Sequence, residues 1–315
     1  MYTKGIFGLC ANKGLGDGER LVSWSQYTRY KKCPKQWKLR YIDKHKILDQ
    51  SIYLVYGTAM HEVIQKYLYV MYTDSVKAAD SLNLQEMLGS ELRKEYMKSY
   101  EESGVHFSDP VELSRYYEYG TQILKFLRKK RRRYFNSKTM ELIGIELPIF
   151  NEPHPNYPKV KMQQYLDLVF YDKTVKKYTI IDIKTSTKGW NKWKRREKLT
   201  TDQVVLYKYY FCEMFDIDPK NVDVEYFILR NIVDEDAEYP PPRISQFKPS
   251  NGSISLKRVS KEFKEFIEEV FNEGGEYNKD RVYHGFRGRN NFNCRYCPYN
   301  EMHDLCPPEN RIDNG

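Results

Sequence analysis

Residues 163–184 place the strongest constraint on how this chain can fold. They read as two strands, QQYLDLVFY and YTIIDIK, joined by the short segment DKTVKK, which is the pattern of a hairpin. Facing residue numbers in an antiparallel pair have a constant sum, so if Tyr171 faces Tyr178, then Asp167 faces Asp182. Their Cβ atoms would then lie about 4.5–5.5 Å apart. The pattern therefore predicts two carboxylates at one point of a sheet.

Two carboxylates this close repel each other and need a compensating positive charge. Hard oxygen ligands beside a lysine suit Mg²⁺ or Mn²⁺ better than zinc. Lys184 shares a face with Asp182, because side chains alternate along a strand, whereas Ile181 and Ile183 point into a core. A bound ion could activate water against a phosphate, with Lys184 steadying the developing charge. The alternative is a solvent-facing strand with no catalytic role, and a shift of one residue in register would separate the carboxylates.

The rest of the chain divides into a helical first part and a strand-rich second part. Ser23 and Gln26 have the spacing of a capping box, which predicts a helix from Trp24 that ends before Pro34. Apolar periodicity and turn residues predict helices at 58–72, 84–100, 110–135, 201–215 and 260–271, strands at 142–150 and 222–230, and a loop at 238–255. This order predicts an α/β core with a helical insertion near residues 73–135.

Composition restricts the class of protein. The chain has 315 residues, a formal charge of +9 and 15% aromatic residues, which is compatible with a nucleic-acid partner. No apolar run approaches the ~18 residues of a membrane-spanning helix, and the beginning of the chain lacks the apolar core of a signal peptide. We therefore expect a cytoplasmic protein with reduced thiols, in which clustered cysteines indicate a metal before disulfides.

Several short motifs, taken in order, resemble the PD-(D/E)XK nuclease superfamily, in particular the RecB/AddB branch that includes CRISPR-associated exonucleases. The resemblance runs from about Ser23 to Cys306 and rests on SWSQYTRYKKCP (23–34), GTAMH (57–61), Glu146 in IGIELPIF, Asp167, the D-x-K signature of Asp182 and Lys184, Gln203 with Tyr207, and CRYCPYNEMHDLC (294–306). It implies a restriction-endonuclease-like core, which is a mixed central sheet flanked by helices. That core would span residues 23–285, between a flexible arm (1–22) and a Cys-rich tail (286–315) that packs on the N-terminal helix.

The resemblance also implies a catalytic centre. Its catalytic residues would be Asp167, Asp182, Lys184 and Glu146, and its ion would be held by His61, Asp167, Asp182 and the carbonyl of Ile183. Two of these residues have simpler alternatives. His61 could be a helix-edge histidine that touches Gln65 and Leu68, and Glu146 could be a second-metal residue or only a surface charge.

Further residues would contact DNA. By resemblance, Gln203 and Tyr207 position DNA beside the metal, although Thr200 and Gln203 could instead form a capping box and Tyr207 could belong to the core. The segment KGWNKWKRREK (188–198) carries residues that could follow a phosphate backbone or stack on bases, namely Lys188, Trp190, Trp193, Arg195 and Arg196. This segment and the basic run 129–133 could equally be solvated surface.

The cysteines are unevenly distributed. Cys294 and Cys297 have metal-ligand spacing, and Cys306 follows. The resemblance supplies Cys33 as a fourth ligand and implies a four-iron four-sulfur (4Fe-4S) cluster that ties the two ends of the chain together. Zinc is an alternative, with His303 able to replace a cysteine, and so is a site without metal. Cys10 and Cys212 are interpreted as bystanders.

These observations predict a Mg²⁺- or Mn²⁺-dependent DNA exonuclease of recombination, repair or DNA processing, in which activated water attacks a phosphodiester without a covalent enzyme intermediate. The alternatives are a non-catalytic DNA-binding or recombination subunit that retains the fold, and a zinc-dependent regulator that would explain the cysteines but not the hairpin. The chain has no G-x-x-x-x-G-K-[ST] motif, so unwinding would come from a partner. That partner could be a helicase, and a recombinase or single-strand-binding protein could also take part.

Overall fold

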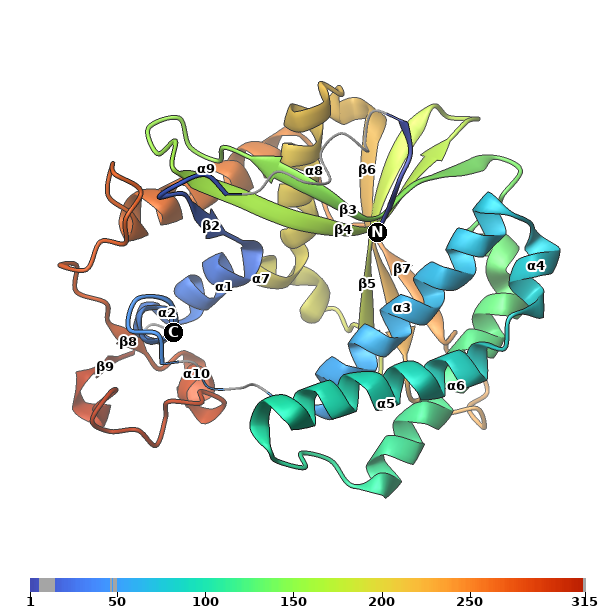
Figure 1. Ribbon diagram of the computed structural model, residues 1–315, viewed down its shortest axis with the longest axis horizontal. Coiled ribbons are helices and arrows are strands. Elements are labelled where there is room, and N and C mark those ends of the chain that lie inside the picture. Colours follow the sequence, from blue (N-terminus) through green and yellow to red (C-terminus); the bar gives the residue numbers. More distant parts are fainter. Residues whose placement is uncertain (6–14, 46, 48–49, 314–315) are drawn as a thin grey trace. The chain divides into compact units, whose positions relative to one another are not determined.

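The computed structural model describes residues 1–5, 15–45, 47 and 50–313 (Figure 1). The chain forms two compact units, each built from three separate segments. The first unit comprises Met1–Asn12, Gln50–Ile149 and Tyr165–Leu256, and the second comprises Lys13–Asp49, Phe150–Gln164 and Lys257–Gly315. Cys10 lies outside the described residues.

The first unit is organised around a mixed sheet with the strand order β1-β3-β4-β5-β6-β7. These strands are β1 (Tyr2–Thr3), β3 (Met140–Asn151), β4 (Val160–Asp172), β5 (Lys177–Ser186), β6 (Val222–Arg230) and β7 (Ile244–Phe247). β5 pairs in parallel with β6, whereas the β1–β3, β4–β5 and β6–β7 pairs are antiparallel. β3 and β4 continue beyond the first unit into segments of the second. A mixed sheet flanked by helices confirms the predicted fold class.

The hairpin between β4 and β5 has the predicted register. Tyr171 faces Tyr178, and the ladder extends to Leu168 opposite Ile181, which leaves Asp167 and Asp182 at the next facing positions. The carboxylate of Asp172 closes the turn by accepting hydrogen bonds from the backbone N–H groups of Thr174 and Val175. A strand pair with this register carries both aspartates at the same level of the sheet.

Helices cover both faces of this sheet. On one face lie α3 (Ile52–Thr73), α4 (Val76–Ser81), α5 (Leu84–Ser103) and α6 (Pro110–Tyr134), whose apolar side chains share one core with Ile181 and Ile183 of β5. Gly120 allows the close approach of α6, because a Cβ atom there would lie 2.5 Å from Leu88 and 2.9 Å from Met60. On the other face lies α8 (Gln203–Phe215), where Phe211 contacts the ring of Tyr178.

Short elements complete the first unit. The 3₁₀ turn η2 (Lys194–Arg196) and helix α7 (Lys198–Thr201) lead from β5 to α8, and η3 (Pro219–Asn221) precedes β6. The hydroxyl of Tyr226 on β6 donates to the carbonyl of Thr200 on α7 at 2.7 Å, which fixes α7 against the sheet.

The second unit has an aromatic core. It contains β2 (Arg20–Val22), α1 (Trp24–Lys32), α2 (Pro34–Tyr41), most of α9 (Ser253–Val270), β8 (Gly285–Phe286), η4 (Arg289–Asn291), α10 (Phe292–Arg295), η5 (Pro308–Asn310) and β9 (Arg311–Ile312). β2 pairs in parallel with the beginning of β4, and β8 pairs in parallel with β9. Tyr30 and Trp37 pack on rings of α9 and the tail, with edge-to-face contacts from Tyr30 to Tyr283 and from Trp37 to Phe266.

Several boundaries differ from the sequence predictions. α3 begins at Ile52 rather than Thr58, because Ser51 caps it by accepting from the N–H of Leu54. The predicted loop 238–255 is wrong in part, since it contains β7 and the start of α9 at Ser253. β7 is a four-residue edge strand that pairs with β6, and so short a strand has little pattern of its own. None of the described helices is long and apolar enough to cross a membrane.

Candidate active site

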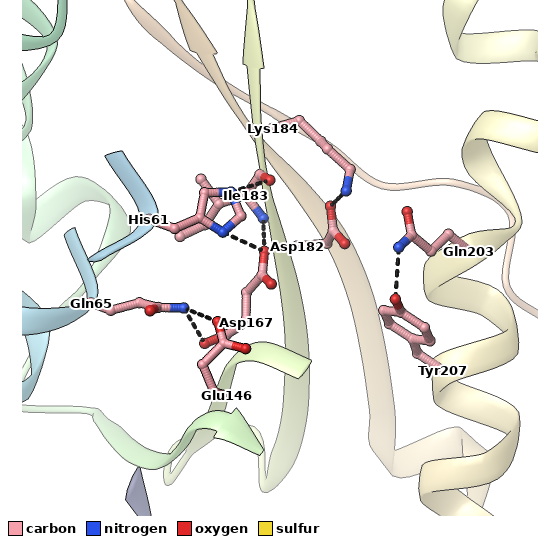
Figure 2. A network of polar contacts seen from close by, with 9 residues as sticks. All are labelled: His61, Gln65, Glu146, Asp167, Asp182, Ile183, Lys184, Gln203 and Tyr207. Atoms are coloured by element: carbon pink, nitrogen blue, oxygen red, sulfur yellow. Dashed lines mark hydrogen bonds and ion pairs between the residues drawn. The ribbon is translucent and has the colours of Figure 1, made fainter. Parts of the chain in front are cut away.

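Three side chains with metal-ligating atoms converge at one point of the first unit (Figure 2). His61 comes from α3, Glu146 from β3 and Asp167 from β4, and one ligand atom of each lies within 4.8 Å of the others. All three side chains are partly exposed, so the point can be reached from solvent. The two carboxylates are donors of the kind that suit Mg²⁺ or Mn²⁺, and the imidazole adds one nitrogen donor to them.

His61 contacts two of the groups predicted to share its ion. Its Nε2 lies 2.8 Å from the carbonyl oxygen of Ile183, and its Nδ1 lies 3.5 Å from Oδ2 of Asp167. Burial, and then the charge of Lys184, lower the pKa of His61, which favours the neutral ring. A carbonyl can only accept, so Nε2 carries the proton and the Nδ1 lone pair faces a carboxylate oxygen. A cation between these two acceptors would satisfy both, which is the arrangement that the ligand interpretation of His61 requires.

Asp167 is held by the neighbouring strand. Its Oδ2 accepts a hydrogen bond of 2.7 Å from the backbone N–H of Ile183. Burial, and then the negative charge of Asp182, raise the pKa of Asp167 well above its usual range. Burial and the nearby second carboxylate both disfavour the charged form of Asp167, and a divalent cation would oppose both effects.

Asp182 and Lys184 lie two residues apart on the same face of β5 and form an ion pair. Nζ of Lys184 lies 2.8 Å from Oδ2 of Asp182, whose side chain is almost fully buried. Burial acts to lower the pKa of Lys184, but the carboxylates of Asp182 and Asp167 outweigh it and raise the pKa. Lys184 is therefore charged at neutral pH. In this structure Asp182 is directed at Lys184 rather than at the convergence point of His61, Glu146 and Asp167.

Glu146 is attached to the site by a residue that the sequence analysis did not single out for a function. Gln65 follows His61 by one helical turn, and its Nε2 donates to Oε1 of Glu146 at 2.6 Å and to the carbonyl of Asp167 at 3.2 Å (Figure 2). The signal available in the sequence was its position, since a polar residue four places after His61 shares a face with it.

Gln203 and Tyr207 contact each other at the start of α8. Nε2 of Gln203 donates to the hydroxyl of Tyr207 at 2.6 Å. The capping-box alternative is wrong, because α8 begins at Gln203 itself, with Asp202 as its N-cap residue, and Thr200 donates to Glu197. Tyr207 is buried, and burial followed by the charge of Asp182 raises its pKa. The pair therefore lies on the side of the sheet that carries Asp182.

The two tryptophans of the basic stretch 188–198 have different environments. Trp190 is only 9% exposed and packs on Tyr226, with ring centroids 4.7 Å apart, so the prediction that it stacks on bases is corrected. Trp193 is 66% exposed and remains available. Lys188, Arg195 and Arg196 are exposed beside it, and the guanidinium of Arg195 lies 5.4 Å from the ring centre of Phe247.

Four cysteines surround a small cavity in the second unit. Cys33, Cys294, Cys297 and Cys306 line a space of about 10 Å³. The N–H of Phe286 donates to the sulfur of Cys33 at 3.4 Å, and Gln36 donates to the sulfur of Cys297 at 3.6 Å. Burial raises the pKa of Cys33 and of Cys297. His303 is exposed and does not line this cavity, and Cys212 is buried in α8.

One family model matches most of the chain. The model, described as the PD-(D/E)XK nuclease superfamily, matches residues 21–306, which include every element that carries the residues above. No curated protein matches the chain.

Proposed function

Because the chain belongs to the PD-(D/E)XK nuclease superfamily, we propose that it is a Mg²⁺- or Mn²⁺-dependent deoxyribonuclease that degrades DNA from its ends. The observation that carries the proposal is the convergence of His61, Glu146 and Asp167 beside the charged pair of Asp182 and Lys184. Nucleases of this superfamily generally use these ions. Recombination, repair or another form of DNA processing would be the setting, with unwinding supplied by a separate helicase.

The residues fit an ion of this kind. His61, Asp167, Asp182 and the carbonyl of Ile183 would hold it, with Glu146 beside them. When bound, the ion would activate a water molecule and neutralise charge on the scissile phosphate. His61 contributes a neutral nitrogen because burial lowers its pKa. Asp182 would bind only if its carboxylate turned partly away from Lys184, which leaves the ammonium group of Lys184 free to contact the phosphate.

Lys184 and the start of α8 have defined tasks in this mechanism. Lys184 stays protonated, so it steadies the negative charge that develops on the phosphate and does not act as a base. The partly exposed side chain of Gln203, fixed by its hydrogen bond to the buried Tyr207, would hold the DNA strand beside the ion. Lys188, Trp193, Arg195 and Arg196 would extend this contact along the strand, through phosphates and one stacked base.

The cysteines of the second unit would hold a 4Fe-4S cluster with a structural role. The spacing of the sulfurs is the observation that favours it over zinc. The four thiols line one cavity, two sulfurs receive hydrogen bonds, and His303 lies outside the cavity. A zinc site with Zn–S bonds of about 2.3 Å requires sulfurs about 3.8 Å apart. Among the described residues, these cysteines do not form a group within 4.8 Å. Iron and sulfide analysis after anaerobic purification tests this, and a colourless protein that contains zinc would refute it.

The activity can be tested with end-labelled linear DNA and closed circular DNA in Mg²⁺ or Mn²⁺. We expect the linear substrate to be degraded and the circle to survive. Asp182→Ala and Lys184→Ala should abolish cleavage, while Lys220→Ala, in a turn on the surface, should leave it unchanged. Cleavage that survives both site substitutions would refute the assignment, and wild-type protein that binds DNA without cutting it would favour the non-catalytic alternative.

A further inference from the structure

The amide of Gln65 occupies a position from which it can shape the acidic part of the site. Gln65 is 4% exposed and lies on α3 one turn beyond His61, so both side chains leave the helix on the same face. Its Nε2 contacts two different strands, at Glu146 of β3 and at the main-chain carbonyl of Asp167 of β4 (Figure 2). The buried amide nitrogen of Gln65 donates hydrogen bonds to both strands. These bonds connect β3 and β4 to α3 at the level of the proposed ion.

Glu146 needs such support because its backbone is unusual. Its φ of +50° lies in the left-handed region, which non-glycine residues seldom adopt inside a strand. The strand is irregular here, since a Cβ atom at Gly144 would lie 2.7 Å from the side chain of Leu147. Conformations of this kind persist where the surroundings fix them, and they gather at functional sites. The hydrogen bond from Gln65 is one contact that fixes the Glu146 carboxylate.

The charges of the site explain why a donor is required at this point. Glu146, Asp167 and the unprotonated Nδ1 of His61 are all acceptors, and they lie within 4.8 Å of one another. Glu146 is partly exposed, so its carboxylate has a solvated alternative to this position unless a donor holds it. An amide donor can hold the carboxylate in place without adding a competing charge.

We propose that Gln65 is a positioning residue, which holds Glu146 toward Asp167 and thereby makes Glu146 part of the divalent-cation site. The inference rests on the proposed function, which supplies the ion. Outer residues that orient metal ligands typically change metal affinity 10–100-fold when they are replaced. Gln65 itself would touch neither the ion nor the DNA.

The test is Mn²⁺ binding to the full chain, measured by the loss of the free-ion electron paramagnetic resonance signal and without any substrate. Gln65→Met should weaken binding 10–100-fold, and Glu146→Gln should weaken it similarly. The double variant should be no weaker than Glu146→Gln alone, because both changes remove the same contribution. Gln122→Met, at an exposed position on α6, is the matched control and should bind as the wild type does.

Two results would overturn the inference: wild-type affinity in Gln65→Met, or losses that add in the double variant. If Gln65→Met does not fold, Gln65→Asn keeps a buried amide but shortens its reach, and it should show the same loss. Failure of the proposed function would give a different experimental result. Wild-type protein without nuclease activity that still loses Mn²⁺ affinity on Gln65→Met would refute the function and leave the positioning role standing.

Two exposed aromatic rings in the second unit form an independent feature, which is a candidate surface for binding single-stranded nucleic acid. Phe292 and Tyr296 are 61% and 71% exposed and contact each other edge to face, with ring centroids 5.3 Å apart. The turn before them has positive φ at Gly288, Asn290 and Asn291. The side chain of Asn293 fixes this turn by donating to the carbonyl of Lys32 at 2.8 Å. The backbone thus holds two large rings in solvent.

Positively charged side chains are exposed in the segments next to the two rings. Arg289 and Arg295 are exposed in the same segment, and Lys31 and Lys32 are exposed at the end of α1, which Asn293 contacts. Exposed rings among unburied cations are the combination that binds single strands, through stacking on bases and attraction to phosphates. We infer that Phe292 and Tyr296 form a binding surface for single-stranded DNA, which deepens the proposed function by giving the substrate a contact in the second unit.

Fluorescence anisotropy with a labelled oligothymidine, in Ca²⁺ to suppress cleavage, tests this surface. Phe292→Ala with Tyr296→Ala should weaken binding about tenfold or more, and leucine at both positions should weaken it too, because leucine cannot stack. Tyr239→Ala, a control at an 83% exposed position, should not. Unchanged affinity in the double alanine variant would overturn the inference. Full affinity with leucine would also overturn it, in favour of an apolar protein partner. Neither result depends on nuclease activity.

Discussion

The pair of Lys184 and Asp182 makes a quantitative prediction about stability. The Asp182 side chain is 4% exposed and the Lys184 side chain 35% exposed, with 2.8 Å between the charged atoms. Removing one partner of a fully buried pair costs about 3–5 kcal/mol, because the other charge stays buried without compensation. Since Lys184 is about one third exposed and partly screened, we expect Lys184→Met to lower the free energy of unfolding by about 2–3 kcal/mol.

The assay is urea unfolding followed by circular dichroism, in EDTA so that no divalent ion replaces the missing charge. Asp182→Asn in the Lys184→Met background removes the stranded carboxylate and should recover most of the loss. Lys194→Met is the matched control, because Lys194 pairs with Glu197 at 2.6 Å but both side chains are nearly half exposed. That substitution should cost at most about 1 kcal/mol.

The pH dependence follows from the direction of the pKa shift. The pKa of Lys184 is raised above 10.5 in the folded protein, so its contribution is fully present below pH 10.5 and is lost only as pH rises through the folded value. The difference between wild type and Lys184→Met should therefore be the same at pH 7 and pH 9. A variant that unfolds within about 0.5 kcal/mol of wild type, as an ordinary surface substitution would, refutes the reasoning.

Three further predictions concern other parts of the molecule. The pKa of His61 is lowered below 6.5 in the folded protein, so the unfolded chain binds a proton at this residue more readily. In urea titrations below pH 6.5, the wild type should therefore lose stability more steeply than His61→Gln. Gly120→Ala should destabilise the protein by about 1–3 kcal/mol, because the new Cβ would lie 2.5 Å from Leu88. Gly89→Ala should be neutral or stabilising, because its Cβ would lie 3.5 Å from Tyr117. Equal shifts in melting temperature for the two variants would contradict this. Cys297→Ser should lower iron content and melting temperature together, and unchanged iron would exclude Cys297 as a ligand.

The hairpin was predictable because its information is local. Two strands with alternating side chains and a short turn leave few registers, and burial of Ile181 and Ile183 selects one of them. Once that register is given, the positions of Asp167 and Asp182 follow. The helix predicted at 58–72, which is most of α3, was predictable for the same reason, because its buried apolar residues recur at helical spacing.

The features that could not be predicted from the sequence depend on contacts between distant segments of the chain. Trp190 was predicted to stack on bases, but in the fold its ring packs against Tyr226 of β6. β7 forms because it can pair with the edge of β6. The roles of Gln65 and Glu146 depend on the contact between α3 and β3. The direction of Asp182 toward Lys184 is likewise a rotamer choice, which residue spacing does not determine.

The most direct test of the central claim is cleavage of linear DNA by the full chain in Mn²⁺, with wild type compared with Asp167→Ala and Asp182→Ala. We expect cleavage that EDTA stops and that both substitutions remove, while the variants remain folded by circular dichroism. Cleavage that persists in either folded variant, or in EDTA, would contradict it.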